Sequence, residues 1–340
     1  MLTVASDAHR GHHGLELHDG ALAPSFECPE RAELIATALH DAGHQRIAPD
    51  VLDDDLVRRV HSPDLVDLLA TAWDRWVARG ERAPAAVGFA WPSLAAPGAR
   101  RPDDLIGQLG FHSFAADTSI VAGTWAAVRE AAAIAQTAAD RVVDGAGAAY
   151  GACRPPGHHA TAERFGGYCY LNNAAIAAQR LLDRGRSRVA VLDVDYHHGN
   201  GTQSIFEARA DVLVASIHAD PREEFPWFAG YADERGTGPG EGWNLNLPLP
   251  RGTGRDEWFG ALDRAVERVA GADVDALVVA LGVDTFAGDP LGTFDLGTPD
   301  FSTAGSRVGE LGLPTVVVQE GGYAVGELGR NVSSFLAGIA

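Results

Sequence analysis

Two aspartates and a histidine stand close together in the run LDVDYHHGNG at residues 192–201. In an extended segment Asp193, Asp195 and His197 share one face, because side chains alternate with a period of two. The apolar residues before them indicate a buried strand, where ionisable groups are costly unless they pair with one another or bind a metal. A carboxylate and an imidazole two residues apart can both bind one divalent ion, so this run predicts a metal site.

A third ligand for that ion is predicted at Asp284, which directly follows the apolar run at 276–283. Asp195, His197 and Asp284 would supply three protein ligands and leave one coordination position open, as in catalytic rather than structural zinc sites. Because two of the three ligands are carboxylates, Fe(II), Co(II) or Mn(II) would also suit the site.

Groups for proton transfer and charge stabilisation are predicted in two further runs. RPPGHHA at 154–160 holds His158 and His159 in a turn restricted by proline and glycine, and histidine titrates near neutral pH. QEGGY at 319–323 ends in Tyr323, whose hydroxyl could donate to a carbonyl oxygen that gains negative charge. Taken singly, a His-His pair or a Gly-Gly-Tyr is more often an ordinary turn.

Each of these runs follows an apolar segment of strand length. The predicted strands are residues 147–153, 188–194, 212–218, 276–283 and 314–319, and helical patterns separate them at 172–184, 203–208, 257–270 and 303–311. This alternation predicts an α/β fold with an open, mostly parallel β-sheet flanked by helices on both faces. Active sites in such sheets gather at the carboxyl ends of the strands, so the four runs should converge.

The first third of the chain has a different pattern. Helices are predicted at 30–39 and 63–77, whereas residues 80–110 are rich in proline and glycine and should form a long ordered loop without helix or strand. Long loops in compact domains are usually functional or bind partners. With no internal repeat or linker, residues 1–340 are predicted to be a single catalytic domain with a loop insertion at about 80–120.

The composition limits the classes of function. The net charge of −19 argues against nucleic acid as a partner and is compatible with a small cationic substrate. No apolar run could span a membrane and no signal-peptide pattern opens the chain, so we expect a cytoplasmic protein without membrane contact. Cys28, Cys153 and Cys169 form no CxxC pair, so we expect small buried side chains rather than disulfides.

Taken together, the runs resemble the signature of a known family. RPPGHHA, FGGYCYLNNAA, DVDYHHGNGTQ, GVDTFAGDPLG and EGGY are similar to the histone deacetylase superfamily. Asn200, AWDRW at 72–76 and GTW at 123–125 look most like the acetylpolyamine amidohydrolases. The resemblance covers nearly the whole chain and implies an arginase/deacetylase-like fold that hydrolyses an N-acylated linear amine with a bound Zn²⁺.

The resemblance also implies roles for individual residues. Asp195, His197 and Asp284 would ligate the zinc, and Tyr323 would polarise the scissile carbonyl. His159 would act as general base and acid, with His158 beside it. Asp193 would hydrogen-bond to His158 and Asn200 to His159. A carboxylate raises a histidine's pKa and a neutral amide does not, so His159 is expected to be neutral.

Substrate and ion contacts follow from the same resemblance. Tyr168 and Phe225 would wall a tunnel, Gly321 would leave room for the acyl group, and Glu16 and Asp117 would meet distal ammonium groups unless they are solvated surface acids. Ile106 stands where an acid is expected, which leaves polyamine against peptide preference open. A structural K⁺ would use Asp193, Asp195, His197, Ser216 and Ile217. The loop at 80–120 would support a homodimer.

Three functions stay open at this point. The first is release of acetate or another acyl group from an N-acyl-amine such as an acetylpolyamine. The second is deacetylation of protein lysines, which needs the same chemistry with wider access. The third is a non-catalytic module that binds acyl-amines.

Overall fold

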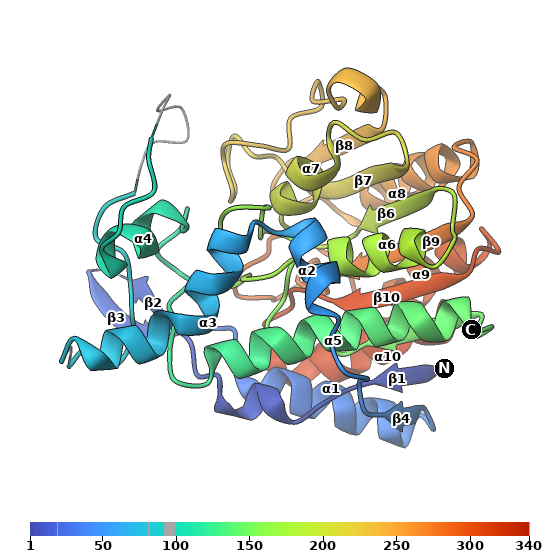
Figure 1. The fold of residues 1–340 in the computed structure, drawn as a ribbon. Helices are drawn as coiled ribbons and strands as arrows, with labels where there is room; N and C mark the ends of the chain where they lie inside the picture. The colour runs from blue at the N-terminus through green and yellow to red at the C-terminus, as the bar shows by residue number, and fades with distance from the viewer. Residues whose placement is uncertain (19, 81, 92–98, 340) are drawn as a thin grey trace.

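The computed structural model describes residues 1–18, 20–80, 82–91 and 99–339 (Figure 1). Within them, one eight-stranded sheet has the order β4-β1-β5-β10-β9-β6-β7-β8, and all its strand pairs are parallel. Its strands are β1 Leu2–Val4, β4 Gln45–Ile47, β5 Ala148–Gly151, β6 Val189–Asp193, β7 Val212–Ala219, β8 Asn244–Leu249, β9 Ala276–Leu281 and β10 Thr315–Gln319. A separate antiparallel hairpin pairs β2 (Leu15–His18) with β3 (Ala21–Pro24). The predicted α/β fold with a parallel sheet is confirmed.

Helices cover both faces of this sheet, because each strand sends alternate side chains to opposite sides. Val189 and Val191 of β6 pack in one apolar cluster with α2, α3, α5 and α6. Ala190 and Leu192 of the same strand pack in a second cluster with α1, α8, α9 and α10. The helices are α1 Pro29–Asp41, α2 Asp54–Val60, α3 Pro63–Ala78, α4 Leu105–Phe111, α5 Thr124–Val143, α6 Asn173–Asp183, α7 Asn200–Phe206, α8 Arg255–Ala270, α9 Thr298–Gly309 and α10 Val325–Ile339. Strands buried on both faces explain why they appear in the sequence as unbroken apolar runs.

The expectation that residues 80–110 contain no helix is wrong, because α4 begins at Leu105. Asp104 caps this helix by accepting a hydrogen bond from the amide of Ile106. The glycines that weakened the helical pattern have a packing role: a Cβ on Gly110 would lie 1.8 Å from the carbonyl oxygen of Ala90. Residues 81 and 92–98 of the expected loop lie outside the described residues.

Two predicted helix boundaries also differ from the structure. Helix α7 begins at Asn200 rather than at residue 203, so it starts inside the run that carries the predicted metal ligands. Helix α9 begins at Thr298 rather than at residue 303, with Pro299 in its first turn and Asp300 accepting from the amide of Gly297. Proline at the start of a helix lacks only an amide that would have no helical partner, so it belongs inside the helix rather than before it.

The cysteines are free, and Cys153 and Cys169 are buried as predicted, whereas Cys28 is partly exposed. Among the residues that the structure describes, no helix has the length and apolarity needed to cross a bilayer.

Candidate active site

The four chemical runs lie at the carboxyl ends of four adjacent strands. The sheet order places β5, β10, β9 and β6 side by side, and all of them run parallel. The tandem-histidine turn follows β5, Tyr323 follows β10, Asp284 follows β9 and Asp193 ends β6. Parallel strands end at one edge of a sheet, so residues far apart in the sequence meet there.

The three predicted metal ligands come together. Their ligand atoms all lie within 4.8 Å of one another. Nδ1 of His197 lies 3.3 Å from Asp195 Oδ1 and 3.1 Å from Asp284 Oδ2. Two backbone amides also point at these carboxylates: Gly321 donates to Asp195 at 2.8 Å and Tyr196 to Asp284 at 2.9 Å.

The chemistry of this donor set suits a divalent cation. Both carboxylates are completely buried, and burying such groups is costly without a compensating positive charge. Burial, together with the neighbouring charge of Asp195, raises the pKa of Asp284 to about 7. A Cβ on Gly321 would lie 2.5 Å from both the Asp195 and the Asp284 carboxylates, so glycine is needed for this close approach. Two carboxylate oxygens and one imidazole nitrogen are ligands that Zn²⁺, Fe²⁺ and Co²⁺ accept.

The tandem histidines have different partners. His158 Nδ1 lies 2.9 Å from Asp193 Oδ2, and His159 Nδ1 lies 2.8 Å from Asn200 Oδ1. Because Oδ1 of the amide can only accept, Nδ1 of His159 carries the hydrogen and Nε2 keeps a lone pair. The two rings lie 4.0 Å apart between centroids, so the charge of one affects the other.

These partners separate the two pKa values. Burial alone would lower the pKa of His158, but the carboxylates of Asp195 and Asp193 outweigh it and raise the pKa to about 10. Burial and the neighbouring His158 and His197 lower the pKa of His159 well below its ordinary value. The geometry therefore favours a charged imidazole at 158 and a neutral one at 159, as expected from their partners.

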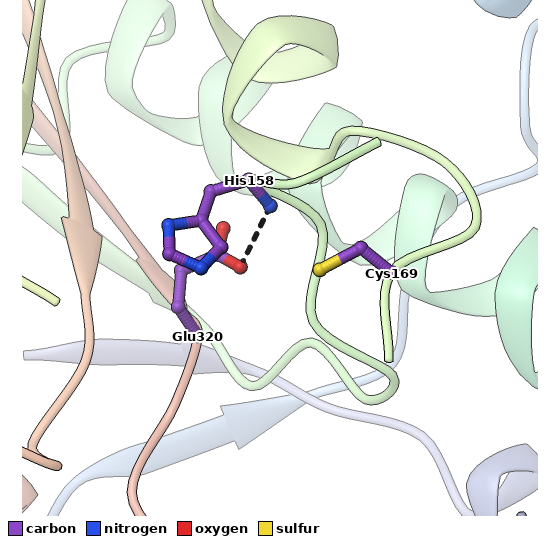
Figure 2. Close-up of side chains that lie close together, drawn as sticks. All are labelled: His158, Cys169 and Glu320. Atoms are coloured by element: carbon purple, nitrogen blue, oxygen red, sulfur yellow. Dashed lines mark hydrogen bonds between the residues drawn. The ribbon is translucent and has the colours of Figure 1, made fainter. Parts of the chain in front are cut away.

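Glu320 supports the histidine turn, a role that the sequence did not suggest. Its Oε2 accepts a hydrogen bond from the amide of Gly157 at 2.6 Å. It also accepts one from the amide of His158 at 3.0 Å, which Figure 2 shows. Glu320 and Cys169 also lie close enough to His158 to form a second possible metal cluster. However, Nδ1 of His158 already binds Asp193, and burial raises the pKa of the Cys169 thiol well above its ordinary value. Of the two groups, Asp195, His197 and Asp284 are therefore the better candidate for holding a metal ion.

Tyr323 is held by residues from distant parts of the chain. Asp289 Oδ2 accepts hydrogen bonds from the amides of Tyr323 at 2.6 Å and Ala324 at 2.9 Å. The guanidinium of Arg31 lies 4.7 Å from the centre of the tyrosine ring and donates to the carbonyl oxygen of Gly322 at 2.7 Å. Neither residue was predicted, because only the fold brings α1 and the segment after β9 to this strand end.

A cavity of about 220 Å³ opens onto these groups. Its lining includes His159, His197 and Tyr323, with Tyr168 and Phe225 as aromatic walls. Phe225 packs edge-on against His159, with ring centroids 4.9 Å apart. A larger hollow of about 710 Å³ lies beside α7 and is lined by Asn200, but His159, His197 and Tyr323 line only the smaller cavity. Gly321 contacts the metal-ligand carboxylates and is not among the residues that line the cavity.

The two predicted ammonium-binding acids both adjoin the wall formed by Tyr168. Glu16 is 7% exposed and accepts a hydrogen bond from the Tyr168 hydroxyl, so it is not a solvated surface acid. Asp117 lines the cavity, and its Oδ1 accepts from the amide of Gly167 at 2.9 Å. Ile106 packs against the hydrophobic core from α4 and does not line the cavity.

The residues predicted for a monovalent cation lie beside the metal ligands. Ser216 is the neighbour of Asp193 in the register of β6 and β7, and Asp195 and His197 follow β6 directly. Ser216 Oγ lies 2.8 Å from Nδ1 of His218, and Ile217 is completely buried. Ser216 therefore lies beside the strand end that carries the predicted metal ligands, and Ile217 follows it in β7.

Known proteins resemble this chain over its whole length. The sequence profile of the histone deacetylase domain matches residues 25–339. Acetylpolyamine amidohydrolase 2 of Pseudomonas aeruginosa is 48% identical over 341 residues, which cover 100% of this chain and 98% of that protein. Acetylpolyamine amidohydrolase of Mycoplana ramosa is 46% identical over 342 residues, with full coverage of both chains.

A solved structure extends the likeness to three dimensions. The crystal structure of an acetylpolyamine aminohydrolase from Burkholderia pseudomallei matches with a TM-score of 0.93 at 39% identity, covering 100% of this chain and 98% of that one. The chain therefore belongs to the histone deacetylase domain family, a family of deacetylase and amidohydrolase enzymes.

Proposed function

We propose that this protein is a metal-dependent amidohydrolase that releases acetate, or another acyl group, from an N-acylated linear amine such as an acetylpolyamine. One observation carries the proposal. Asp195, His197 and Asp284 cluster together, and His197 lines the same cavity as His159 and Tyr323, with Tyr168 and Phe225 as aromatic walls. The full-length relatives named acetylpolyamine amidohydrolase support the substrate class.

Asp195, His197 and Asp284 would hold the metal, with zinc as our first choice and Fe²⁺, Co²⁺ or Mn²⁺ as alternatives. When bound, such an ion supplies Lewis acidity toward a carbonyl oxygen and lowers the pKa of water. The side chains supply the proton transfers and the orientation of the substrate.

His159 is the base in this proposal. Its Nδ1 donates to Asn200, so Nε2 is free to accept a proton from the attacking water, and its low pKa keeps it neutral beforehand. Nε2 can then return that proton to the departing amine nitrogen. His158, charged through its contact with Asp193, stabilises the negative charge that develops beside it.

The Tyr323 hydroxyl donates a hydrogen bond to the carbonyl oxygen of the scissile amide as that oxygen gains negative charge. Tyr168 and Phe225 enclose the methylene stem of the substrate and exclude water from the reacting atoms. A K⁺ would bind beside the site and fix the segments that carry the metal ligands. Its ligands would come from carboxylates and backbone carbonyls of Asp193, Asp195, His197, Ser216 and Ile217.

We also propose a homodimer formed through the loop at 80–120. Phe89 in this loop is 73% exposed and Trp91 is 39% exposed, and the adjacent hairpin exposes Leu17 and Leu22. Exposed large apolar side chains can mark a protein interface. Sedimentation equilibrium should give twice the monomer mass for the native protein, and Phe89→Asp should weaken the association. A native protein that sediments as a monomer at micromolar concentration would refute the dimer.

The test of function is a substrate panel with zinc-loaded protein. N-acetylputrescine, N-acetylcadaverine and N-acetylspermidine are compared with acetyl-lysine peptides, and released acetate is measured. Turnover of the small amines supports the proposal, and faster turnover of peptides would favour a protein lysine deacetylase. Tight binding without acetate release would favour a non-catalytic module, and no hydrolysis of any amide would reject the enzyme.

A further inference from the structure

The far end of an N-acyl diamine carries an ammonium group that has to be recognised beyond the aromatic walls. An ammonium loses hydration as it enters a narrow cavity, so it needs a carboxylate nearby. Both candidates suggested by the sequence already accept hydrogen bonds from the protein. Glu16 Oε2 binds the Tyr168 hydroxyl, and Asp117 Oδ1 accepts from Thr118 Oγ1 at 2.6 Å and from the amide of Gly167. These bonds fix the shape of the Tyr168 wall.

Besides Asp117, a second carboxylate lines the same cavity. Glu224 directly precedes the other aromatic wall, Phe225, and lies in a turn in which its amide donates to the carbonyl oxygen of Asp220 at 3.0 Å. Its side chain is 15% exposed, so it lies near the cavity entrance rather than fully buried within the protein. Each aromatic wall is thus accompanied by one cavity-lining acid, Asp117 beside Tyr168 and Glu224 beside Phe225.

Glu224 differs from the other two acids in the partner that it binds. Its Oε1 accepts a hydrogen bond from Nη1 of Arg251, in the loop after β8, and this guanidinium side chain is 51% exposed. Water partly screens an ion pair whose arginine is half exposed, and forming the pair requires ordering that long side chain. A cation that arrives through the cavity can therefore replace Arg251 at low cost, while Arg251 turns into solvent.

We propose that Glu224 is a specificity-determining residue, which exchanges Arg251 for the distal ammonium of an N-acyl diamine. This inference rests on the proposed amidohydrolase function and adds a preference for charged over neutral acyl-amines. The role of Glu224 also explains how a cationic substrate could be recognised although residue 106 is not an acid, since Ile106 does not line the cavity.

The test uses two substrates of equal length that differ only in charge. N-acetylputrescine ends in an ammonium, and N-pentylacetamide carries a methyl group in its place. For Glu224→Gln the ratio of the two kcat/KM values, charged over neutral, should fall about tenfold, mainly through KM of the charged substrate. For Arg251→Gln the same ratio should rise about threefold, because the competing cation is gone. Glu223→Gln, which removes the same charge from an exposed neighbour, is the matched control.

Calorimetric binding of the same two compounds to the native protein and to Glu224→Gln keeps the inference testable even without turnover. Weaker binding of only the charged compound to Glu224→Gln supports the assignment. An equal change for both compounds would show that Glu224 acts through the position of Phe225, and no change would show that it meets no ligand. Either result overturns the inference. Absence of hydrolysis by the native protein would refute only the proposed reaction.

Discussion

The strand ends and the cavity entrance of this molecule are built in opposite ways. At the strand ends Asp195, Asp284 and Glu320 are completely buried, and backbone amides bond to their carboxylates. At the entrance Glu224 pairs with an exposed arginine, and Trp227, next to the Phe225 wall, is 50% exposed. Buried, hydrogen-bonded groups are costly to change, whereas exposed loops tolerate substitution. The reaction should therefore depend on the strand ends and the choice of substrate on the entrance.

The largest effect should come from removing a ligand at the strand ends. His197→Ala leaves two adjacent buried carboxylates without the imidazole, so bound zinc should be lost and kcat should fall at least roughly 10³-fold. Elemental analysis and acetate release measure the two quantities on the same sample. His13→Ala, which removes an exposed histidine, is the control. One retained zinc per chain together with near-normal activity would contradict the ligand assignment.

A smaller loss of kcat is expected for a variant that should still bind the metal but lacks one hydrogen-bond donor at the strand ends. Tyr323→Phe removes only the hydroxyl, so kcat should fall about 10²–10³-fold with unchanged zinc content. Arg31 and Asp289 still hold the segment, so the free energy of unfolding in urea should change little. An unchanged kcat would exclude Tyr323 from the mechanism.

Residue patterns alone predicted the strand ends, whereas Tyr168, Phe225, Glu16 and Asp117 near the cavity were predicted only from the family resemblance, for a physical reason. Apolar runs of strand length followed by ionisable residues are local patterns, and parallel topology alone then brings Asp193, Asp284 and Tyr323 to one edge. Glu16 bonds to Tyr168 across 152 residues, a contact that no spacing rule contains. Glu224 lies in a loop without periodic pattern, and its role becomes visible only when the cavity is formed.

Glu320 shows that long-range contacts cannot be predicted from the sequence even when the residue lies within a recognised motif. Its type and position are visible in QEGGY, but its partners are the amides of Gly157 and His158, 163 and 162 residues away. Short-range patterns predict which segments end at the site. They do not predict which buried carboxylate supports a neighbouring turn, because that depends on how the strand ends pack.

His158 and His159 have different hydrogen-bond partners and therefore different pKa values, and this difference can be tested by varying the pH. Asn200→Asp would place a carboxylate against His159, which favours the charged imidazole and raises its pKa. A base with a higher pKa is protonated at a higher pH, so the acid limb of kcat/KM should move upward by about one unit or more. At a pH that lies on the acid limb of both enzymes, the variant should therefore be about tenfold less active than the native enzyme, relative to each plateau. An acid limb at its native position in a pH 5–9 profile would indicate that His159 is not the base.

The smallest effect is expected at the residue where the sequence lacks the expected acid. Ile106 packs against the core from α4 and does not line the cavity of its own chain, so Ile106→Glu should change the charged-to-neutral kcat/KM ratio less than twofold. It should lower the free energy of unfolding by about 1 kcal/mol, because a charge enters a partly buried apolar position. Ile106→Gln separates the effect of charge from that of size, and both variants are measured by urea unfolding and by the two-substrate ratio. A severalfold gain for the charged substrate in Ile106→Glu alone would mean that residue 106 reaches an entrance other than that of its own chain. Such a gain would require a second subunit and would make the entrance a property of the dimer.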